Sequence, residues 1–168
     1  LLAVSAFFSG SETALTGANP ARLHLLAKGG DKRAARAERL IAIKDRVVSS
    51  ILIGNNLVNI LASALATMLF STLFGGFGVV VATVVMTVLV VVFAEVLPKT
   101  FALRRPDAAA LRVSRPLSLL TALFAPLTFA LGRVNSWILP DNRADDSEGE
   151  EALRGAIALH GSQGDAEN

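Results

Sequence analysis

The chain has 168 residues, of which 52% are hydrophobic and 18% are charged, and its formal net charge is +2. Its mean hydropathy of +0.54 exceeds that of ordinary soluble domains, and its charges gather in clusters between long uncharged segments, as in integral membrane proteins. The absence of cysteine excludes a disulfide, a thiolate metal site and a cysteine nucleophile. The basic stretches lack interleaved aromatic residues, which argues against a nucleic-acid partner.

Three apolar segments are predicted to cross the membrane as helices. The first, residues 1–15, is too short to span a bilayer, and we expect the chain to begin inside a membrane helix. The second, residues 47–74, holds no charge across about 28 residues, which at about 1.5 Å per residue exceeds a hydrocarbon core about 30 Å thick. A glycine-rich turn at 75–78 leads into the third, residues 77–97. Its valines would favour a strand in water, but its length and scarcity of charge favour a membrane helix.

A basic stretch, residues 20–46, separates the first two spans. Asn19 can cap a helix that starts at Pro20, and the Gly-Gly-Asp sequence at 29–31 divides the stretch into two short helices. Its apolar residues recur on a charged background, which predicts amphipathic helices at the membrane surface. A solvated loop is the alternative.

The region after the third span is predicted to lie along the membrane rather than to cross it. A helix-start signal opens a short amphipathic helix over 106–114. The apolar segment 116–139 then contains Pro126 near its middle and Arg133 in its second half, which argues against a fourth crossing. We expect a juxtamembrane, belt-like or re-entrant helical segment here.

Basic residues on one side of the spans predict the orientation of the chain. Residues 20–46 hold eight Lys or Arg and residues 99–115 hold five, whereas the turn at 75–78 holds none. Because cytoplasmic loops are enriched in Lys and Arg, both basic stretches are predicted to be cytoplasmic, with the N-terminus outside and the C-terminus inside a plasma (inner) membrane. The acidic segment 141–168, with one predicted helix over 148–160, is then a cytoplasmic linker.

Polar oxygens are concentrated at a few positions of the predicted spans. Ser5 and Ser9 are four residues apart and share a helix face, as do Asn55 and Asn59. Glu95 is the single acid between residues 45 and 107, and a carboxylate at the edge of an apolar span is costly without a cation, a proton or a partner. Three helices could present hydroxyl, amide and carboxylate oxygens to one point. Such oxygens are the ligands of hard cations such as Mg²⁺, Ca²⁺ or Na⁺.

Backbone features lie beside these side chains. Pro98 has no N–H and cannot bond the carbonyl of Ala94, which is released for another partner. Gly10 follows Ser9, and Gly54 precedes Asn55, so close helix approach or local unwinding is possible at both places. Broken helices that offer carbonyls to ions recur in transporters.

Each of these features also has a structural explanation. A serine hydroxyl in a membrane helix often bonds a carbonyl one turn back, and asparagine pairs can simply hold helices together. Glu95 could pair with Lys99, four residues later, as an interfacial anchor. Nothing in the pattern supports covalent catalysis or hydrolysis, and we expect no enzyme activity.

Three motifs resemble the DUF21 transmembrane domain of the CorC/CNNM family of magnesium transporters. They are FFSGSETAL at 7–15, GNNLVNI at 54–60 and FAEVLPKTFA at 93–102, and the resemblance covers about residues 1–140. The sequence EEALRGAIALHGSQGD at 150–165 is similar to the acidic helical linker that precedes the pair of cytoplasmic CBS modules in this family.

The resemblance implies an all-α membrane protein, a homodimer with three transmembrane helices and a juxtamembrane belt in each protomer. It implies Mg²⁺ export, with Na⁺ as a candidate coupling ion, and ATP-binding CBS modules that lie beyond this sequence. A non-transporting Mg²⁺ sensor or anchor is the alternative. Carried over by motif, the ligand candidates are Ser5, Ser9, Asn55 and Glu95, with Asn59 and the backbone at Gly10, Gly54 and Ala94 in support.

Overall fold

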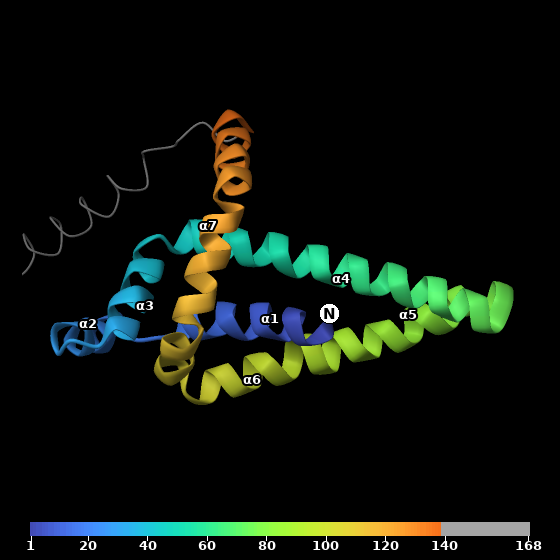
Figure 1. Ribbon diagram of the computed structural model, residues 1–168, viewed down its shortest axis with the longest axis horizontal. Helices are drawn as coiled ribbons and strands as arrows, with labels where there is room; N and C mark the ends of the chain where they lie inside the picture. Colours follow the sequence, from blue (N-terminus) through green and yellow to red (C-terminus); the bar gives the residue numbers. More distant parts are fainter. Residues whose placement is uncertain (139–168) are drawn as a thin grey trace, which may run out of the picture. The chain divides into compact units, whose positions relative to one another are not determined.

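The computed structural model describes residues 1–138, and every secondary-structure element in that range is a helix (Figure 1). Residues 1–128 form one compact unit, which carries the features described below; of the second unit, 129–168, only the end of the last helix is described. The acidic segment and its predicted helix over 148–160 lie outside the described residues. In chain order the helices are α1 (Leu2–Gly17), α2 (Pro20–Lys28), α3 (Lys32–Ala42), α4 (Lys44–Phe74), the 3₁₀ turn η1 (Gly75–Phe77), α5 (Gly78–Leu89), the π-helix η2 (Val90–Val96), α6 (Leu97–Arg104) and α7 (Pro106–Ile138).

A long helical hairpin dominates the compact unit. Its first arm is α4, and its second arm is the continuous run of α5, η2 and α6 (Figure 1). The turn depends on glycine: Gly75 has a φ of 60°, and a Cβ at Gly78 would lie 2.3 Å from the carbonyl oxygen of Phe70. The predicted turn and the helical state of the valine-rich segment are therefore confirmed.

Helix α1 lies between the two arms and packs against α4, η2 and α6 (Figure 1). Around its C-terminal half and the adjoining helices the chain builds its main apolar core, to which α7 contributes its first turns. The members of this core include Phe8, Ala14, Leu15, Leu23, Leu40, Val47, Ile51, Ala102, Ala110 and Leu117.

The basic stretch folds as the two short helices that its sequence predicts. Asn19 caps α2 by accepting hydrogen bonds from the N–H groups of Ala21 and Arg22, and Asp31 caps α3 by accepting one from Arg33. That backbone hydrogen bond lowers the pKa of the Asp31 carboxyl.

A second set of contacts ties this basic end to the start of α7. Asp107 accepts a hydrogen bond from the N–H of Asn19 at 2.8 Å and forms an ion pair with Arg22 at 3.0 Å. The α1–α2 junction is thereby joined to α7.

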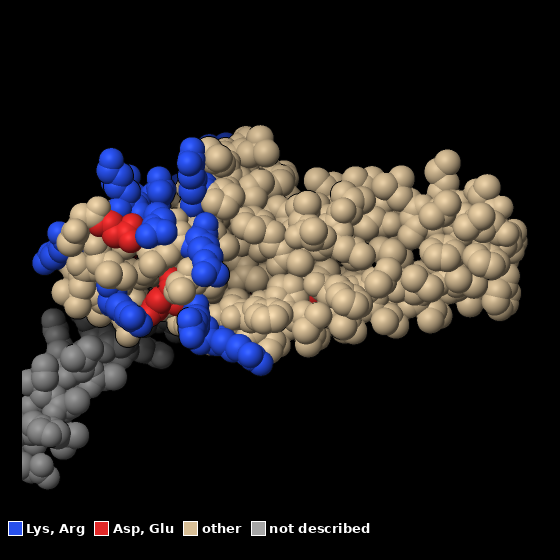
Figure 2. Space-filling view, turned by 60° about the horizontal axis from the view of Figure 1, so that its bottom comes forward, with Lys and Arg blue, Asp and Glu red and all other residues tan. Residues whose placement is uncertain are grey.

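Charged and apolar surfaces are segregated along the hairpin. Figure 2 shows Lys and Arg gathered over the end formed by α2, α3 and the neighbouring helix termini, while the rest of the hairpin on this face is almost free of charge. The uncharged part exposes large apolar side chains, including Leu57, Ile60, Leu65, Met68, Leu69, Leu73, Val80, Val84 and Val88. Such a surface needs an apolar surrounding rather than water.

Two helical runs of the described residues are long and apolar enough to cross a membrane, namely Lys44–Arg104 and Pro106–Ala130. The first run folds back on itself at the glycine turn. Only 22% of the most apolar window of each run is buried inside the chain, whereas the core helix of a soluble protein would be mostly buried. Helix α1, with 16 residues, is below crossing length within this chain.

The prediction for the region after α6 was wrong in its boundaries. The sequence predicted one short helix over 106–114 and a separate segment over 116–139, but α7 runs without a break through Pro116 and Pro126. Each proline removes one backbone hydrogen bond, and the surrounding turns hold the helix together. Nearby hydroxyls also bond carbonyls within the helix, as Ser118 does with Arg115 at 2.8 Å.

Candidate cation site

One hydrogen bond joins the two helices that carry the serine and asparagine pairs. The hydroxyl of Ser5 on α1 donates to the side-chain oxygen of Asn55 on α4, at 2.6 Å. Ser5 is fully buried and Asn55 is half-buried. Two of the predicted ligands, 50 residues apart in sequence, therefore lie in direct contact.

The second member of each pair holds an oxygen without a partner. Within residues 1–138, the hydroxyl of Ser9 and the side-chain oxygen of Asn59 are buried and make no hydrogen bond. A serine that merely bonded its own helix would use its hydroxyl, as Thr13 does with the Ser9 carbonyl at 3.3 Å. Buried polar atoms are normally satisfied, so two orphan oxygens one helical turn from a bonded pair mark a polar site.

Asn59 also borders an open space between the two arms of the hairpin. This cavity of about 510 Å³ lies between α4 and the second arm, and Val90 and Val91 of η2 line it opposite Asn59. Ser63 and Thr67 continue its wall at four-residue intervals along α4. Sequence reasoning missed this polar stripe, although the same spacing that paired Asn55 with Asn59 could have extended it.

Ala94 and Glu95 lie in a helical segment that is wider than an α-helix. Residues Val90–Val96 form a π-helix, and the N–H of Leu97 bonds the carbonyl of Val92, five residues earlier. Ala94 is fully buried and Glu95 is half-buried within this segment. Pro98 lies two residues beyond this segment and supplies no N–H, so the π-helix occurs where the sequence predicted a disturbed pattern of backbone hydrogen bonds. Single-turn π segments inside α-helices are frequent at functional sites.

The two glycines beside the pairs allow close helix packing. A Cβ on Gly54 would lie 2.4 Å from the ring of Phe8, so the α1–α4 contact depends on its absence. A Cβ on Gly10 would lie 3.5 Å from Pro98, at ordinary contact distance. Gly54 thus sets the α1–α4 spacing at the level of Asn55, and Gly10 faces Pro98 in the first turn of α6.

The alternative partner for Glu95 is engaged elsewhere. Lys99 pairs with Glu12 of α1 at 3.7 Å, and among the described residues Glu95 forms no ion pair. The anchor pairing of Glu95 with Lys99 is therefore not formed. Glu12 lies in the body of α1 and is held there by this ion pair.

The predicted ligands are brought together only in part. Ser5 and Asn55 are in contact, but no hydrogen bond within residues 1–138 joins Glu95 to Ser9, Asn55 or Asn59. Helix α1 nevertheless packs against both α4 and η2, so the other two ligand-bearing segments share α1 as a neighbour. The described residues contain no cluster of three or more His, Cys, Asp or Glu, so a cation here would rely on neutral oxygens and one carboxylate.

Outward-facing apolar helices around an oxygen-lined interior define an integral membrane domain. The whole chain, residues 1–168, matches the family described as CNNM, the Cyclin M transmembrane N-terminal domain. The chain belongs to this CorC/CNNM family, as its three motifs predicted.

Curated relatives agree with this assignment. The chain is 46% identical over 136 residues to the UPF0053 inner membrane protein YfjD of Escherichia coli, covering 81% of this chain and 32% of the relative. It is 43% identical over 130 residues to a UPF0053 protein of Haemophilus influenzae, covering 77% and 31%, and 30% identical over 174 residues to the UPF0053 protein YhdT of Bacillus subtilis, covering 92% and 38%. The chain thus spans about a third of the length of these relatives.

Proposed function

We propose that this domain carries Mg²⁺ across the membrane through a site between α1, α4 and η2. The observation that carries the proposal is the Ser5–Asn55 hydrogen bond flanked by the orphan oxygens of Ser9 and Asn59. Oxygen donors are what Mg²⁺ requires, and buried unpartnered ones are available to an ion without first breaking a protein hydrogen bond. Glu95 supplies the charge of the site, and the Ala94 carbonyl is a supporting ligand.

The charge balance of this site suits transport better than permanent binding. One carboxylate against a divalent ion leaves net positive charge in a low-dielectric surrounding, which is costly if the ion stays. Weak retention assists release. A rocking of α1 against the hairpin would open the oxygens to one side and then to the other.

We further propose three crossings per protomer, by α1, α4 and the α5–α6 arm, with the basic end in the cytoplasm and the N-terminus outside. The segregation of Lys and Arg in Figure 2 supports this orientation. The homodimer, the export direction, the use of Na⁺ as coupling ion and the regulation by CBS modules are proposals that rest on family membership.

Calorimetric titration with Mg²⁺ tests the site directly. Glu95→Gln should abolish measurable heat of binding, because the carboxylate is the sole charged donor of the proposed ligand set. The matched control is Glu12→Gln, which removes the same charge from α1 but breaks only the ion pair with Lys99. Equal Mg²⁺ binding by wild type and Glu95→Gln, with helicity unchanged, would refute the site.

Flux measurements separate a transporter from the alternative, a Mg²⁺ sensor without transport. Proteoliposomes containing the domain and an internal Mg²⁺-sensitive dye should show a saturable Mg²⁺ flux that Glu95→Gln removes. Binding by calorimetry without any flux would favour the sensor. Flux that rises linearly with Mg²⁺ concentration would indicate a channel rather than a carrier.

A further inference from the structure

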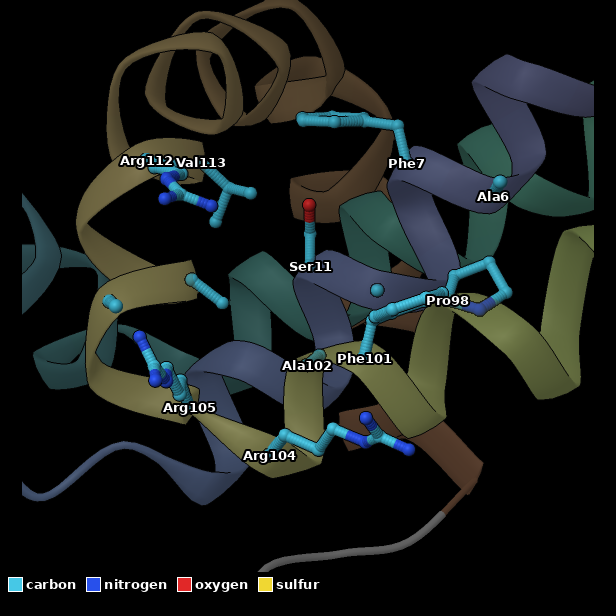
Figure 3. Close-up of a pocket in the computed structure, with 13 residues that line it drawn as sticks. Ala6, Phe7, Ser11, Pro98, Phe101, Ala102, Arg104, Arg105, Arg112 and Val113 are labelled. Atoms are coloured by element: carbon cyan, nitrogen blue, oxygen red, sulfur yellow. The ribbon is translucent and has the colours of Figure 1, made fainter.

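A second pocket opens where α1, α6 and the start of α7 meet, and of the candidate cation ligands only Gly10 borders it. It encloses about 470 Å³, a size typical of small-molecule sites. Figure 3 shows its wall: Phe7 and Ser11 come from α1, Pro98 and Phe101 from the second arm, and Arg112 from α7.

The lining combines apolar side chains with an excess of positive charge. Arg104, Arg105 and Arg112 border the pocket, and no acidic residue does. Within residues 1–138 none of these three arginines pairs with a carboxylate; Arg104 lies over the ring of Phe101, 6.0 Å from its centroid. The nearby acid, Asp107, is occupied by Arg22 and the N–H of Asn19.

A buried hydroxyl between the apolar and the charged parts is unused. Ser11 is fully buried, and its oxygen makes no hydrogen bond within the described part of the chain. In Figure 3 this hydroxyl stands between Phe7 and the neighbouring Arg112 and Val113. An orphan donor at this place indicates a ligand with a polar group, since an apolar occupant would leave it unsatisfied.

The pocket also lies at a particular level of the molecule. Arg104 and Arg105 also border a neighbouring space together with Arg22 and Leu26 of the basic helix α2, while Ala6, Phe7 and Val113 supply an apolar wall. For a membrane domain this is the boundary between headgroups and acyl chains. Basic pockets between membrane helices at this boundary suit anionic lipid headgroups.

We propose that this pocket binds one anionic phospholipid, with its phosphate among the three arginines and the Ser11 hydroxyl, and part of an acyl chain against Phe7 and Phe101. The lipid would lie against the Gly10–Pro98 contact, which adjoins the π segment. Its occupancy would therefore stabilise the packing of α1 on α6.

Native mass spectrometry of the purified full chain tests this proposal. Titration with dioleoyl phosphatidylglycerol and with dioleoyl phosphatidylcholine should give one tight site that prefers phosphatidylglycerol by about tenfold to a hundredfold, since the three arginines attract the net negative charge that phosphatidylcholine lacks. The variant R104Q/R105Q/R112Q should lose this preference. Millimolar inorganic phosphate should not displace the lipid, because it lacks the acyl chain.

The matched control is K28Q/K32Q/R39Q, which removes the same charge from α2 and α3. None of these three residues lines the pocket. It should keep the preference. An equal loss in both triple variants, equal affinity for the two lipids, or displacement by inorganic phosphate alone would overturn the proposal.

A second variant tests the proposal independently, so that the result does not depend on the triple arginine variant folding correctly. Ala108→Phe keeps all charges and fills the pocket from an exposed position. It should reduce phosphatidylglycerol binding at least about tenfold while circular dichroism shows an unchanged helix content. Unchanged binding in this variant would also contradict the proposed binding site of the lipid.

Discussion

The two halves of the α4–α6 hairpin are built by different rules. The half beside α1 buries small and polar residues, among them Ser50, Gly54, Ala94 and Ala102, and it carries the one hydrogen bond between side chains of α1 and α4. The half beyond α1 exposes leucine and valine, and its threonines bond only their own helix, as Thr72 does with Met68 at 2.8 Å.

This difference shows that the two halves place unequal constraints on their side chains. Near α1 the helices approach closely, so each side chain is constrained by shape and by hydrogen-bond partners. In the outer half, van der Waals contact between α4 and α5 and a tight glycine turn suffice, and the remaining surface meets lipid. Substitutions should therefore be costly in the first half and tolerated in the second.

The largest effect should come from adding one methyl group near α1. Gly54→Ala would place a Cβ 2.4 Å from the Phe8 ring, which is 3% exposed and has little room to move. We expect a loss of about 1–3 kcal/mol in unfolding free energy, as for other overpacked cores. Thermal unfolding in detergent measures it.

The control for this prediction is Gly76→Ala in the outer turn, where a Cβ meets nothing within 4 Å. It should leave the melting temperature unchanged. The double variant Phe8→Leu with Gly54→Ala should recover part of the loss; a Gly54→Ala protein as stable as wild type would contradict the packing argument.

A smaller effect should follow from removing the hydroxyl that joins α1 to α4. Ser5→Ala leaves the Asn55 oxygen without its partner, at a cost of about 0.6–1 kcal/mol. Thr72→Ala removes a hydroxyl of the outer half and should change stability by less than about 0.5 kcal/mol. Chemical unfolding of both variants under the same conditions compares the two halves of the hairpin. Equal losses of unfolding free energy would contradict the proposed difference between them.

The ion pair between Lys99 and Glu12 should contribute less still. Its side chains are 46% and 30% exposed and its atoms 3.7 Å apart, so solvent screens it. Lys99→Gln should cost about 0.2–1 kcal/mol at low salt, and the loss should shrink as salt rises. A loss that is independent of ionic strength would mean that Lys99 acts through packing instead.

The smallest effect should lie at the exposed start of α3. The pKa of Asp31 is lowered from 3.8 by the hydrogen bond from Arg33, so the folded state favours the ionised carboxylate. Its stabilisation is therefore present above pH 3.8 and is lost as the pH falls through the lowered value. Helicity measured by circular dichroism should decline there slightly more in wild type than in Asp31→Asn, which caps without titrating.

Local rules in the sequence predicted much of this fold. The Asn19 cap, the break at 29–31 and the glycine turn at 75–78 each depend on a residue type whose geometry is fixed by its own chemistry. The continuous α7 was missed because proline perturbs a helix locally, while neighbouring turns and hydroxyls decide whether the helix ends.

Of the candidate site, the structure shows one contact between residues that the sequence had grouped, the hydrogen bond between Ser5 and Asn55. Four-residue spacing identifies residues that share a face of one helix, as Ser5 does with Ser9 and Asn55 with Asn59. It cannot tell which partner helix a face meets or which hydroxyl stays unbonded. The fit of Phe8 against Gly54 and the pairing of Lys99 with Glu12 depend on tertiary contacts between segments far apart in sequence.

The π segment affects which side of the whole second arm faces α1 and α4. Its buried residues Ala82, Met86, Ala94 and Ala102 are spaced by multiples of four. A regular α-helix advances about 100° per residue, so over 20 residues such a stripe would drift to the opposite side. The wide turn at Val90–Val96 offsets part of that drift and keeps one side facing α4 and α1. Deleting a single residue from the regular helix α5, outside this wide turn, would rotate α6 by about 100° against the start of α5 and turn Pro98 away from Gly10. The regular part of this arm should therefore tolerate substitutions far better than changes in length.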